Sequence, residues 1–323
     1  MRSSPGLKRL PRDGACAADS LRERTRAHIC VCVCTYRRPI LLTRLLSELE
    51  RQETGALFDY SVVVVDNDSA RSARETTERH ARASRLSIDY HVEPEQNISL
   101  ARNKAIENAR GDLIALIDDD EVPIPRWLLS LYEAMAFYDS DGVLGPVVPR
   151  FEEKPPRWVL KGGFFDRSSH PTGYVLGWKN TRTGNALLNR GIFGSRRGWF
   201  DPALGSGGED RDFFKRKIEE GRVFVWCNEA PVFETVPARR WKRTVLLKRA
   251  LLRGEMAFYA AHSRLQSVVA SMVAIVAYSI CLPLFLVLGH HLFMKYLVKI
   301  FDHLGKVLTF LHLKPVSETY VQG

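Results

Sequence analysis

Cysteine is sparse in this chain of 323 residues, and its spacing fits neither a disulfide framework nor a metal site. Six cysteines are too few to cross-link a chain of this length, which indicates a reducing compartment. Cys30, Cys32 and Cys34 alternate at the period of a strand, so their side chains share one face. Because zinc sites use wider spacing and more ligands, we interpret these thiols as core residues.

Apolar runs are absent from the start of the chain, so we expect no secretory signal peptide there. This segment contains Pro, Gly, Ser and mixed charge without any periodicity. Such a composition cannot bury enough apolar surface to fold by itself. The sequence therefore predicts a flexible basic tail over residues 1–26.

Positive charge is unevenly distributed along the chain, whose net charge is +10. Residues 239–264 hold eight Arg and Lys against one Glu, and an apolar block follows them. Aromatic residues are not interleaved with the basic ones, as a nucleic-acid stacking platform requires, so we expect no nucleic-acid partner. A basic block beside an apolar block instead favours anionic lipid.

The most informative stretch is residues 111–125, where an apolar run ends in four acids and then in two prolines. This pattern predicts a buried strand that delivers carboxylates to its C-terminal edge, where α/β sheets bind ligands. Adjacent carboxylates repel one another, and a hard divalent cation, Mg²⁺ or Mn²⁺, would relieve that repulsion. A solvated acidic turn is the alternative.

Two earlier apolar runs also end in polar residues. Residues 29–34 precede Thr35, Tyr36 and Arg37 and then a helical pattern, and residues 62–65 precede Asp66 and Asn67. A weaker strand is predicted at 86–92, followed by a helix with Ser99 as its N-cap that runs to Gly111. Strands alternating with helices predict a largely parallel α/β sheet whose loops, with Arg102 and the acids, meet at one edge.

The second half of the chain is less regular. We expect a helix from Trp127, a strand over 142–148 and a strand over 183–188. Between the two strands, the irregular stretch over 150–180 is of a length typical of a functional loop or a lid. A flexible loop over 205–210 should lead into a helix over 211–219. Acids near a helix start are favoured by its dipole, so Glu209, Asp210 and Asp212 also have a purely structural interpretation.

Together these motifs resemble those of glycosyltransferase family 2, the inverting, nucleotide-sugar-dependent enzymes of GT-A fold. The resemblance extends from about Ile29 to Arg240 and is carried by Thr35-Tyr36-Arg37, Val65-Asp66-Asn67, Ala101-Arg102-Asn103, Asp118-Asp119-Asp120 and Gly208-Glu209-Asp210. Segments 32–39 and 97–103 are most similar to the succinoglycan-type bacterial polysaccharide glucosyltransferases.

The resemblance implies a GT-A fold, a Rossmann-like, mostly parallel sheet flanked by helices, and a set of site residues. The nucleotide would be bound by Thr35, Tyr36, Arg37, Asp66, Asn67, Arg102 and Asp119. Asp118 and Asp120 would hold Mg²⁺ or Mn²⁺, and Asp210 would be the catalytic base. An Asx turn after the strand is the alternative for Asp66 and Asn67.

One departure from the family concerns its processive members, which carry Gln two residues before an Arg-Trp pair. Arg240 and Trp241 are present, but the preceding residues 236–239 contain no Gln, so we expect one sugar per encounter. Glu209, Glu234, Arg240 and Trp241 are candidates for the acceptor side. A buried salt bridge is the alternative for Glu234.

The C-terminal region contains 23 residues without a charge, 267–289, which is long enough for a membrane helix. A buried soluble helix is the alternative. Lys295, Lys299, Asp302 and Lys306 share one face of the following segment, 292–313, which predicts an amphipathic interfacial helix. Positive charge flanks the apolar run on both sides, which favours a re-entrant hairpin or shallow insertion, kinked at Pro283, over one full span.

These observations predict three regions: the tail over 1–26, a GT-A domain over 27–238 and membrane-associated helices over 239–323. Within the GT-A domain, 27–120 would bind the nucleotide and 121–238 the acceptor. The expected activity is transfer of a hexose to a lipid-linked oligosaccharide, with UDP-glucose as the first candidate donor. The expected context is synthesis of an exopolysaccharide or a cell-envelope glycan. We expect it at the cytoplasmic face of the inner membrane. A membrane-tethered nucleotide-sugar-binding protein without catalysis is the alternative.

Overall fold

The computed structural model describes residues 26–195, 197–205, 207–259, 261, 263–313 and 316. Apart from Arg26, the predicted tail therefore lies outside the described residues.

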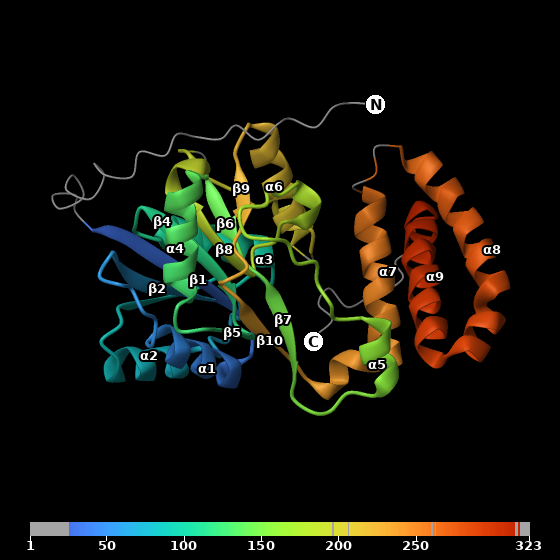
Figure 1. Cartoon of the computed structure of the whole chain (residues 1–323), viewed down its shortest axis with the longest axis horizontal. Helices are drawn as coiled ribbons and strands as arrows, with labels where there is room; N and C mark the ends of the chain where they lie inside the picture. The colour runs from blue at the N-terminus through green and yellow to red at the C-terminus, as the bar shows by residue number, and fades with distance from the viewer. Residues whose placement is uncertain are drawn as a thin grey trace.

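A seven-stranded sheet lies at the centre of the structure, in the order β3-β2-β1-β4-β8-β6-β9 (Figure 1). Its strands are β1 Ala27–Thr35, β2 Phe58–Asp66, β3 Ile88–Val92, β4 Leu113–Asp118, β6 Gly142–Leu144, β8 Asn185–Asn189 and β9 Phe224–Trp226. Strand β8 is antiparallel to both of its neighbours, β4 and β6, while the other pairs are parallel. The predicted mostly parallel α/β sheet is thus confirmed.

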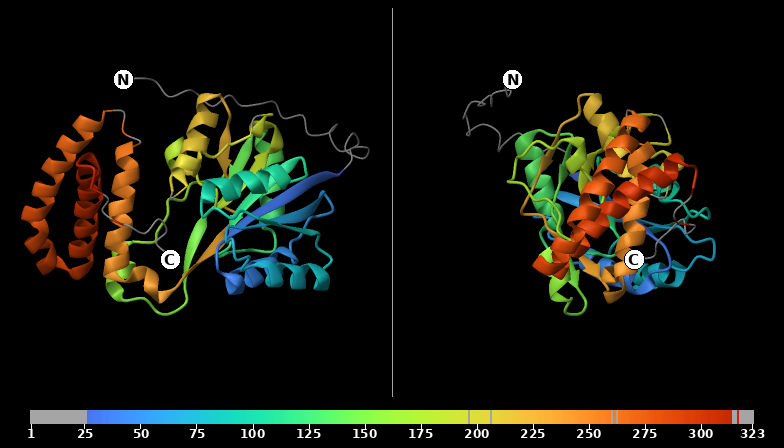
Figure 2. Two further views of the ribbon diagram at one scale, coloured as in Figure 1. Left: turned by 180° about the vertical axis from the view of Figure 1, so that it is seen from behind. Right: turned by 90° about the vertical axis from the view of Figure 1, so that its right-hand side faces the viewer.

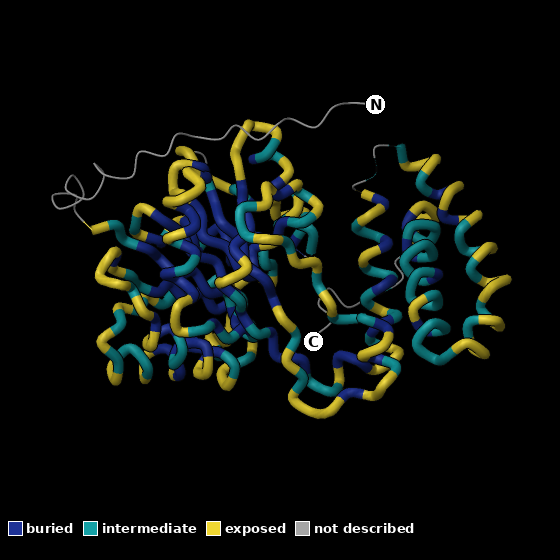
Figure 3. Tube along the Cα trace, viewed as in Figure 1, coloured by how far each residue is buried: buried dark blue, intermediate teal, exposed yellow. Residues whose placement is uncertain are grey.

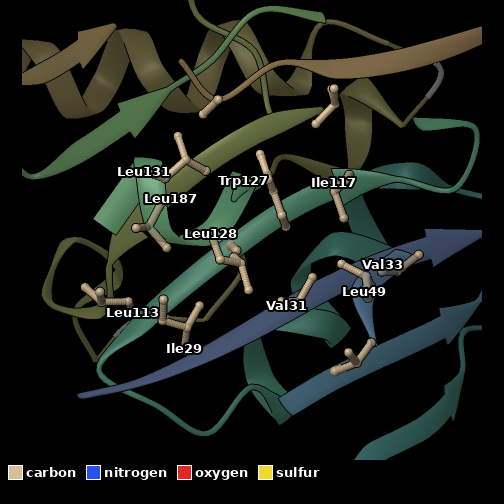
Figure 4. Packing of buried hydrophobic residues seen from close by; sticks show 14 of the residues in the cluster. Ile29, Val31, Val33, Leu49, Leu113, Ile117, Trp127, Leu128, Leu131 and Leu187 are labelled. Atoms are coloured by element: carbon tan, nitrogen blue, oxygen red, sulfur yellow. The ribbon is translucent and has the colours of Figure 1, made fainter. Parts of the chain in front are cut away.

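Helices cover both faces of this sheet. One face carries α1 Pro39–Leu49, α2 Arg74–Ala83 and α4 Trp127–Tyr138, and the other carries α3 Ile98–Asn108 and α6 Glu209–Glu219. Figure 4 shows Trp127 and Leu128 packed among β1 and β4 side chains on the first face.

The side chains of β1 alternate between the two apolar cores that these helices complete. Ile29, Val31 and Val33 face the first core, whereas Cys30 and Cys32 face the second. The interpretation of Cys30 and Cys32 as core residues is therefore confirmed, while Cys34, near the end of the strand, is only partly buried against the same core.

Strand register brings the predicted polar residues to one edge of the sheet. Thr35 pairs with Asp66 across β1 and β2, and Cys34 pairs with Asp118 across β1 and β4. Because these strands are parallel, their carboxyl ends lie side by side, as the sequence predicts.

A second, three-stranded sheet contains β5 Glu121–Pro123, β10 Val232–Val236 and β7 Val147–Phe151. The prediction of one strand over 142–148 is wrong, because the chain leaves the large sheet after β6 and enters the small one at β7. Gly145 and Pro146 occupy the crossing. Pro146 has no N–H for a ladder, and a Cβ at Gly145 would lie 2.4 Å from the Ala230 carbonyl oxygen.

Helix α3 is capped by Asn97, not by Ser99 as predicted. The Asn97 backbone is extended, and its side-chain oxygen accepts hydrogen bonds from the backbone N–H of Ser99 (3.0 Å) and Leu100 (3.3 Å). The helix also ends earlier than predicted, at Asn108.

Two other predictions of irregular structure need correction. The stretch over 150–180 contains the short helix α5 Arg157–Gly162 and a 3₁₀ turn, η1 Trp178–Asn180. Helix α6 begins at Glu209 rather than Arg211, which places Glu209 and Asp210 in its first turn. Their negative charge is favourable there because of the helix dipole.

Three long helices follow the sheets: α7 Arg243–Tyr259, α8 Arg264–Leu288 and α9 His290–Phe310. A 3₁₀ turn, η4 Ala238–Trp241, joins β10 to α7 at the predicted division between the two regions. Helix α9 packs between α7 and α8 beside the sheet domain (Figures 1 and 2). Helix α8 continues through Pro283, and the chain reverses at Gly289 instead.

Lys295, Lys299, Asp302 and Lys306 lie on α9, and two of these side chains make contacts between the helices. The position of α9 at a membrane interface stays a prediction. Asp302 of α9 forms a two-pronged ion pair with Arg253 of α7, at 3.0 and 3.2 Å. Lys299 lies over the rings of Tyr278 and Tyr296. These side chains therefore join the three helices, while the outer face of α8 is largely exposed (Figure 3).

Candidate active site

A cavity of about 320 Å³ opens at the carboxyl ends of β1, β2 and β4. The predicted site residues that line it are Thr35, Tyr36, Arg37, Asn67, Arg102, Asp118, Asp119, Asp120, Glu209 and Glu234. The structure thus brings together residues from both halves of the sheet domain. Asp66, Asp210, Arg240 and Trp241 lie outside this lining.

The four acids after β4 differ sharply in their surroundings. Asp119 accepts hydrogen bonds from Thr35 Oγ1 (2.7 Å) and Arg38 Nη1 (2.8 Å) and is 4% exposed. Glu121 is 1% exposed and accepts a hydrogen bond from the Asp118 backbone N–H at 3.1 Å. This burial contradicts the alternative of a solvated acidic turn.

Asp118 and Asp120 are the acids whose surroundings suit a cation. The Asp118 side chain is 45% exposed, and burial and then the charges of Asp119 and Asp118 raise the pKa of Asp120 to about 7. A bound cation would relieve this repulsion. Among the described residues no group of three or more His, Cys, Asp or Glu is assembled for a metal. Mg²⁺ and Mn²⁺ fit such a sparse oxygen site, because substrate phosphates and water can complete their coordination.

Arg102 connects α3 to two other parts of the site. Its Nη1 donates to Glu209 Oε1 at the start of α6, and its Nη2 donates to Asp118 Oδ1 at 3.3 Å. The second Glu209 oxygen, Oε2, is buried and has no hydrogen-bond partner among the described residues. Glu209 lines the cavity and thus holds one buried acceptor atom that the described residues do not satisfy.

The predicted nucleotide side is held by a loop after β2. Asp66 is fully buried and accepts hydrogen bonds from Asp68 N–H (3.2 Å), Ala73 N–H (2.7 Å) and Tyr90 Oη (2.9 Å). The contact with Asp68 is an Asx turn, so the structural alternative for Asp66 is present in the fold. Its contact with a nucleotide stays a prediction.

Asn67 shapes the same loop from inside the cavity. Its side chain donates to the carbonyl oxygens of Glu93 and Glu95 and accepts from the Asn97 backbone N–H. Nearby, Arg37 has a positive φ of 54° and forms an ion pair with Asp68 at 3.0 Å. These contacts order the polar loops that border the predicted nucleotide position.

Asp210, the predicted base, lies beside the cavity in the first turn of α6. Its Oδ1 accepts a hydrogen bond from the Arg211 backbone N–H at 2.7 Å, and its side chain is partly exposed. The catalytic role of Asp210 stays a prediction.

The acceptor-side candidates Glu234, Arg240 and Trp241 form a packed unit. Glu234 is 5% exposed and forms ion pairs with Arg167 and with Arg240, the latter at 2.7 Å. The buried salt bridge considered for Glu234 is thus present. Trp241 packs edge-on against Phe151.

The sequence-based site omits two basic residues that line the cavity, Arg38 and Arg239. Arg38 contacts Asp119 and also Asp120, at 3.3 Å, and Arg239 lines the cavity. Arg38 directly follows the motif Thr35-Tyr36-Arg37, and this adjacency was the available sequence signal. Nothing in the local pattern distinguishes Arg239 from the other residues of its basic block.

Comparison with known proteins gives a consistent result. The family described as Glycosyl transferase family 2 matches residues 30–201. The chain is 38% identical over 237 residues to the succinoglycan biosynthesis protein ExoM of Rhizobium meliloti, which covers 71% of this chain and 73% of ExoM. It is 25% identical over 245 residues to the chondroitin synthase of Escherichia coli, covering 65% of this chain and 35% of that protein.

Among solved structures, the chain is similar to residues 1–349 of S. aureus TarS in complex with UDP. The TM-score is 0.50 at 19% sequence identity, over 69% of this chain and 64% of that chain. This chain therefore matches just under two thirds of the TarS fragment. At this level of identity the likeness shows the shared fold.

Proposed function

Because this chain belongs to glycosyltransferase family 2, we propose that it transfers a hexose from a UDP-hexose donor to a lipid-linked oligosaccharide, with inversion at the sugar. UDP-glucose is the first candidate donor, and synthesis of an exopolysaccharide or envelope glycan is the proposed context. The similarity to ExoM, a succinoglycan biosynthesis protein, supports this context.

The observation that carries the proposal is the pairing of crowded carboxylates with arginines in one cavity. Asp118 and Asp120 lie at the end of β4. Arg38, in the loop after β1, contacts Asp120, and Arg102, on α3, contacts Asp118. Carboxylates that share a cation with a diphosphate, together with guanidinium groups that bind phosphate, form a site for a nucleoside diphosphate. A glycosyl donor develops negative charge on that diphosphate as its bond to the sugar breaks.

Each group of residues has a separate task in the proposed reaction. Thr35 and Asn67 border the nucleotide, and Arg102 stabilises the charge of the departing diphosphate. Mg²⁺ or Mn²⁺ held by Asp118 and Asp120 would supply Lewis-acid neutralisation of that charge. Asp210 accepts the proton of the acceptor hydroxyl while its oxygen attacks the anomeric carbon. A single in-line displacement then inverts that carbon.

The proposed location is the cytoplasmic face of the inner membrane. Within the described residues, helix α8 alone is long and apolar enough to cross a membrane, with a mean hydropathy of 2.4, and only 6% of its most apolar window is buried. Val273, Ile280 and Val287 are each more than half exposed on it. An uncovered apolar helix next to the basic block 239–264 supports association with anionic lipid.

The direct test is nucleotide release from a panel of nucleotide sugars. Purified protein with Mn²⁺ and a bacterial membrane extract should release UDP from UDP-glucose and label the lipid fraction with glucose. Asp120→Ala should lose both signals, while Asp89→Ala, which removes an exposed carboxylate on β3, should keep them. Donor binding without nucleotide release or lipid labelling from any sugar would favour a binding protein without catalysis.

A further inference from the structure

Helix α7 forms one side of the region around the candidate site. At its start, η4 places Arg240 against Glu234 and 3.7 Å from Asp120. Further along, Met256 reaches the loop before α6, where a Cβ at Gly207 would lie 2.9 Å from Met256 Sδ. The helix therefore extends beside the site, from near Asp120, a candidate metal ligand, to the loop that precedes Asp210.

Arg249 lies between these two contacts and on the same side of α7. It precedes Met256 by seven residues, which is about two helical turns, so both side chains project in the same direction. The side chain is half-buried and forms no hydrogen bond or ion pair with any residue in the described part of the chain. The charges that act on the Arg249 side chain are those of Arg240, Glu234, Asp120 and Arg38. The side chain therefore points toward the candidate site.

The carboxylates that attract Arg249 are already paired with other arginines. Glu234 is bound by Arg240 and Arg167, and Asp120 by Arg38. Burial and then the charge of Arg240 lower the pKa of Arg249 to about 10, so the guanidinium stays positive at neutral pH. Within the described part of the chain, this half-buried cation thus has no counter-ion of its own.

A second donor in the same cluster is also unused. Arg240 is 8% exposed, and its Nε is buried without a hydrogen-bond partner among the described residues. A buried donor left without a partner costs about 1–3 kcal/mol. Two arginines with unused donors at one place favour an anion with several acceptor oxygens, and phosphate esters supply them.

We propose that Arg249 and Arg240 form a phosphate-binding subsite for the acceptor, and that its occupant is the phosphate or diphosphate group of the carrier lipid. This inference rests on the proposed function. The predicted nucleotide residues Thr35 and Asn67 lie at the end of β1 and directly after β2, whereas α7 approaches the acids from the side of β10.

The course of the chain favours a lipid over a soluble anion as the source of this phosphate. Helix α7 leads directly to α8, whose apolar side chains are exposed. A lipid that bears a diphosphate could place its hydrocarbon chain against this apolar helix and its charged group beside α7. The acceptor saccharide would then extend from the phosphate toward Asp210.

The experiment uses the full chain in phosphatidylcholine nanodiscs with saturating UDP and Mn²⁺. Farnesyl diphosphate is the probe, farnesol is the control without phosphate, and affinities are measured by calorimetry. The wild type should bind farnesyl diphosphate while UDP is bound, and should bind farnesol much more weakly. Arg249→Gln should weaken farnesyl diphosphate binding by about tenfold or more and leave UDP affinity unchanged.

Two further variants make the result specific. Arg243→Gln removes an exposed arginine from the same helix and should bind the probe as the wild type does. Arg249→Lys keeps the charge but loses the guanidinium fork, so it should recover part of the affinity. Nanodiscs that contain phosphatidylglycerol should not displace the probe, because a phospholipid headgroup is not the proposed occupant.

Several outcomes would overturn the subsite. One is an unchanged affinity for farnesyl diphosphate in Arg249→Gln, and another is a loss of farnesol affinity in that variant as large as its loss of farnesyl diphosphate affinity. The others are competition between UDP and farnesyl diphosphate, and displacement of the probe by phosphatidylglycerol. The UDP titration in the same samples tests the proposed function separately. A wild-type chain that does not bind UDP would contradict the glycosyltransferase proposal itself, whereas the outcomes above contradict only the role of Arg249.

Discussion

Glu209 and Asp210 are adjacent in the sequence but have different surroundings at the start of α6. Glu209 is nearly buried and bound to Arg102, while Asp210 is partly exposed and contacts its own helix. The ion pair with Arg102 occupies one carboxylate oxygen of Glu209. Among the described residues Asp210 forms no ion pair, and its Oδ1 alone accepts a hydrogen bond, so Oδ2 can receive an acceptor hydroxyl.

Replacing Asp210 by Asn tests this division of roles. The amide keeps the size of the side chain but lacks a basic oxygen, so transfer should fall by about 10²–10⁴-fold while binding of UDP and Mn²⁺ stays near normal. Asp212→Asn is the matched control, because Asp212 lies in the same helical turn and pairs with Arg216. A structural role in the helix dipole predicts similar, mild effects for both variants. Single-turnover transfer assays with UDP titrations distinguish the two cases.

Asp120 offers a second test at the residue scale. Its removal leaves Asp118 as the exposed carboxylate of the cluster, and one such ligand holds a cation and a diphosphate poorly. Asp120→Ala should therefore lose the part of UDP affinity that depends on Mn²⁺. Calorimetric titration of UDP with Mn²⁺ and with EDTA measures that part, and an undiminished metal effect in the variant would count against the assignment.

The sequence predicted which polar residues meet, because strand ends and parallel order can be read from local patterns. Thr35, Asp66 and Asp118 lie at the ends of three apolar runs, and the register then places them side by side. Their individual contacts could not be predicted. The hydrogen bond from Thr35 to Asp119 and the ion pair of Arg102 with Glu209 join residues far apart in the chain, and no local pattern selects those partners.

At the scale of elements, the sequence located the long helices but not their packing. The uncharged run predicts the helix that the structure shows as α8. The sequence also gives α9 an apolar face and a charged face, but it does not show that both faces contact α7 and α8. Likewise, the apolar pattern of 142–148 contains no sign that its two ends enter different sheets, apart from Gly145 and Pro146.

The contact between α7 and α9 depends on two glycines and can be tested. A Cβ at Gly305 would lie 2.2 Å from the Leu251 carbonyl oxygen, and one at Gly254 would lie 2.1 Å from that of Asp302. Alanine in an open helix stabilises it by about 1 kcal/mol relative to glycine. Here the overlap should outweigh that gain, so Gly305→Ala should lower the free energy of unfolding by about 1–3 kcal/mol.

Urea unfolding in detergent micelles measures this change. Gly177→Ala is the control, because a Cβ at Gly177 has no atom within 4 Å and its φ of −85° suits alanine. We also expect Gly305→Ala to reduce sugar transfer, since α7 borders the site. A Gly305→Ala chain more stable than the wild type would mean that the two helices are not in close contact.

At the scale of the whole molecule, the sheet domain and the three helices share one functional region rather than being independent units. The sequence predicts a boundary near residue 238, but α7 beyond it contacts the loop before α6 through Met256. The basic composition of 239–264 does not indicate which part of the molecule α7 packs against. Removing the C-terminal helices should therefore impair catalysis as well as release the protein from membranes.

The position of α8 in the membrane can be tested through its thiol. Cys281 is exposed on this helix, whereas burial raises the pKa of Cys34 to about 12 and that of Cys227 to about 11, which keeps both thiols unreactive at pH 7.5. Cys16 lies outside the described residues and is replaced by Ser in all variants. If lipid covers the apolar face of α8, a charged maleimide should not label Cys281 in native membranes.

A reference thiol at Glu153, an exposed loop residue of the sheet domain, makes the result quantitative. In inside-out membrane vesicles Glu153→Cys should be labelled quickly while Cys281 is not, and both should react after unfolding in SDS. In intact cells the impermeant reagent should label neither, because the sheet domain is proposed to face the cytoplasm. Equal labelling rates for the two thiols in vesicles would show that α8 contacts water, and the apolar helix would then have to bind another protein surface rather than lipid.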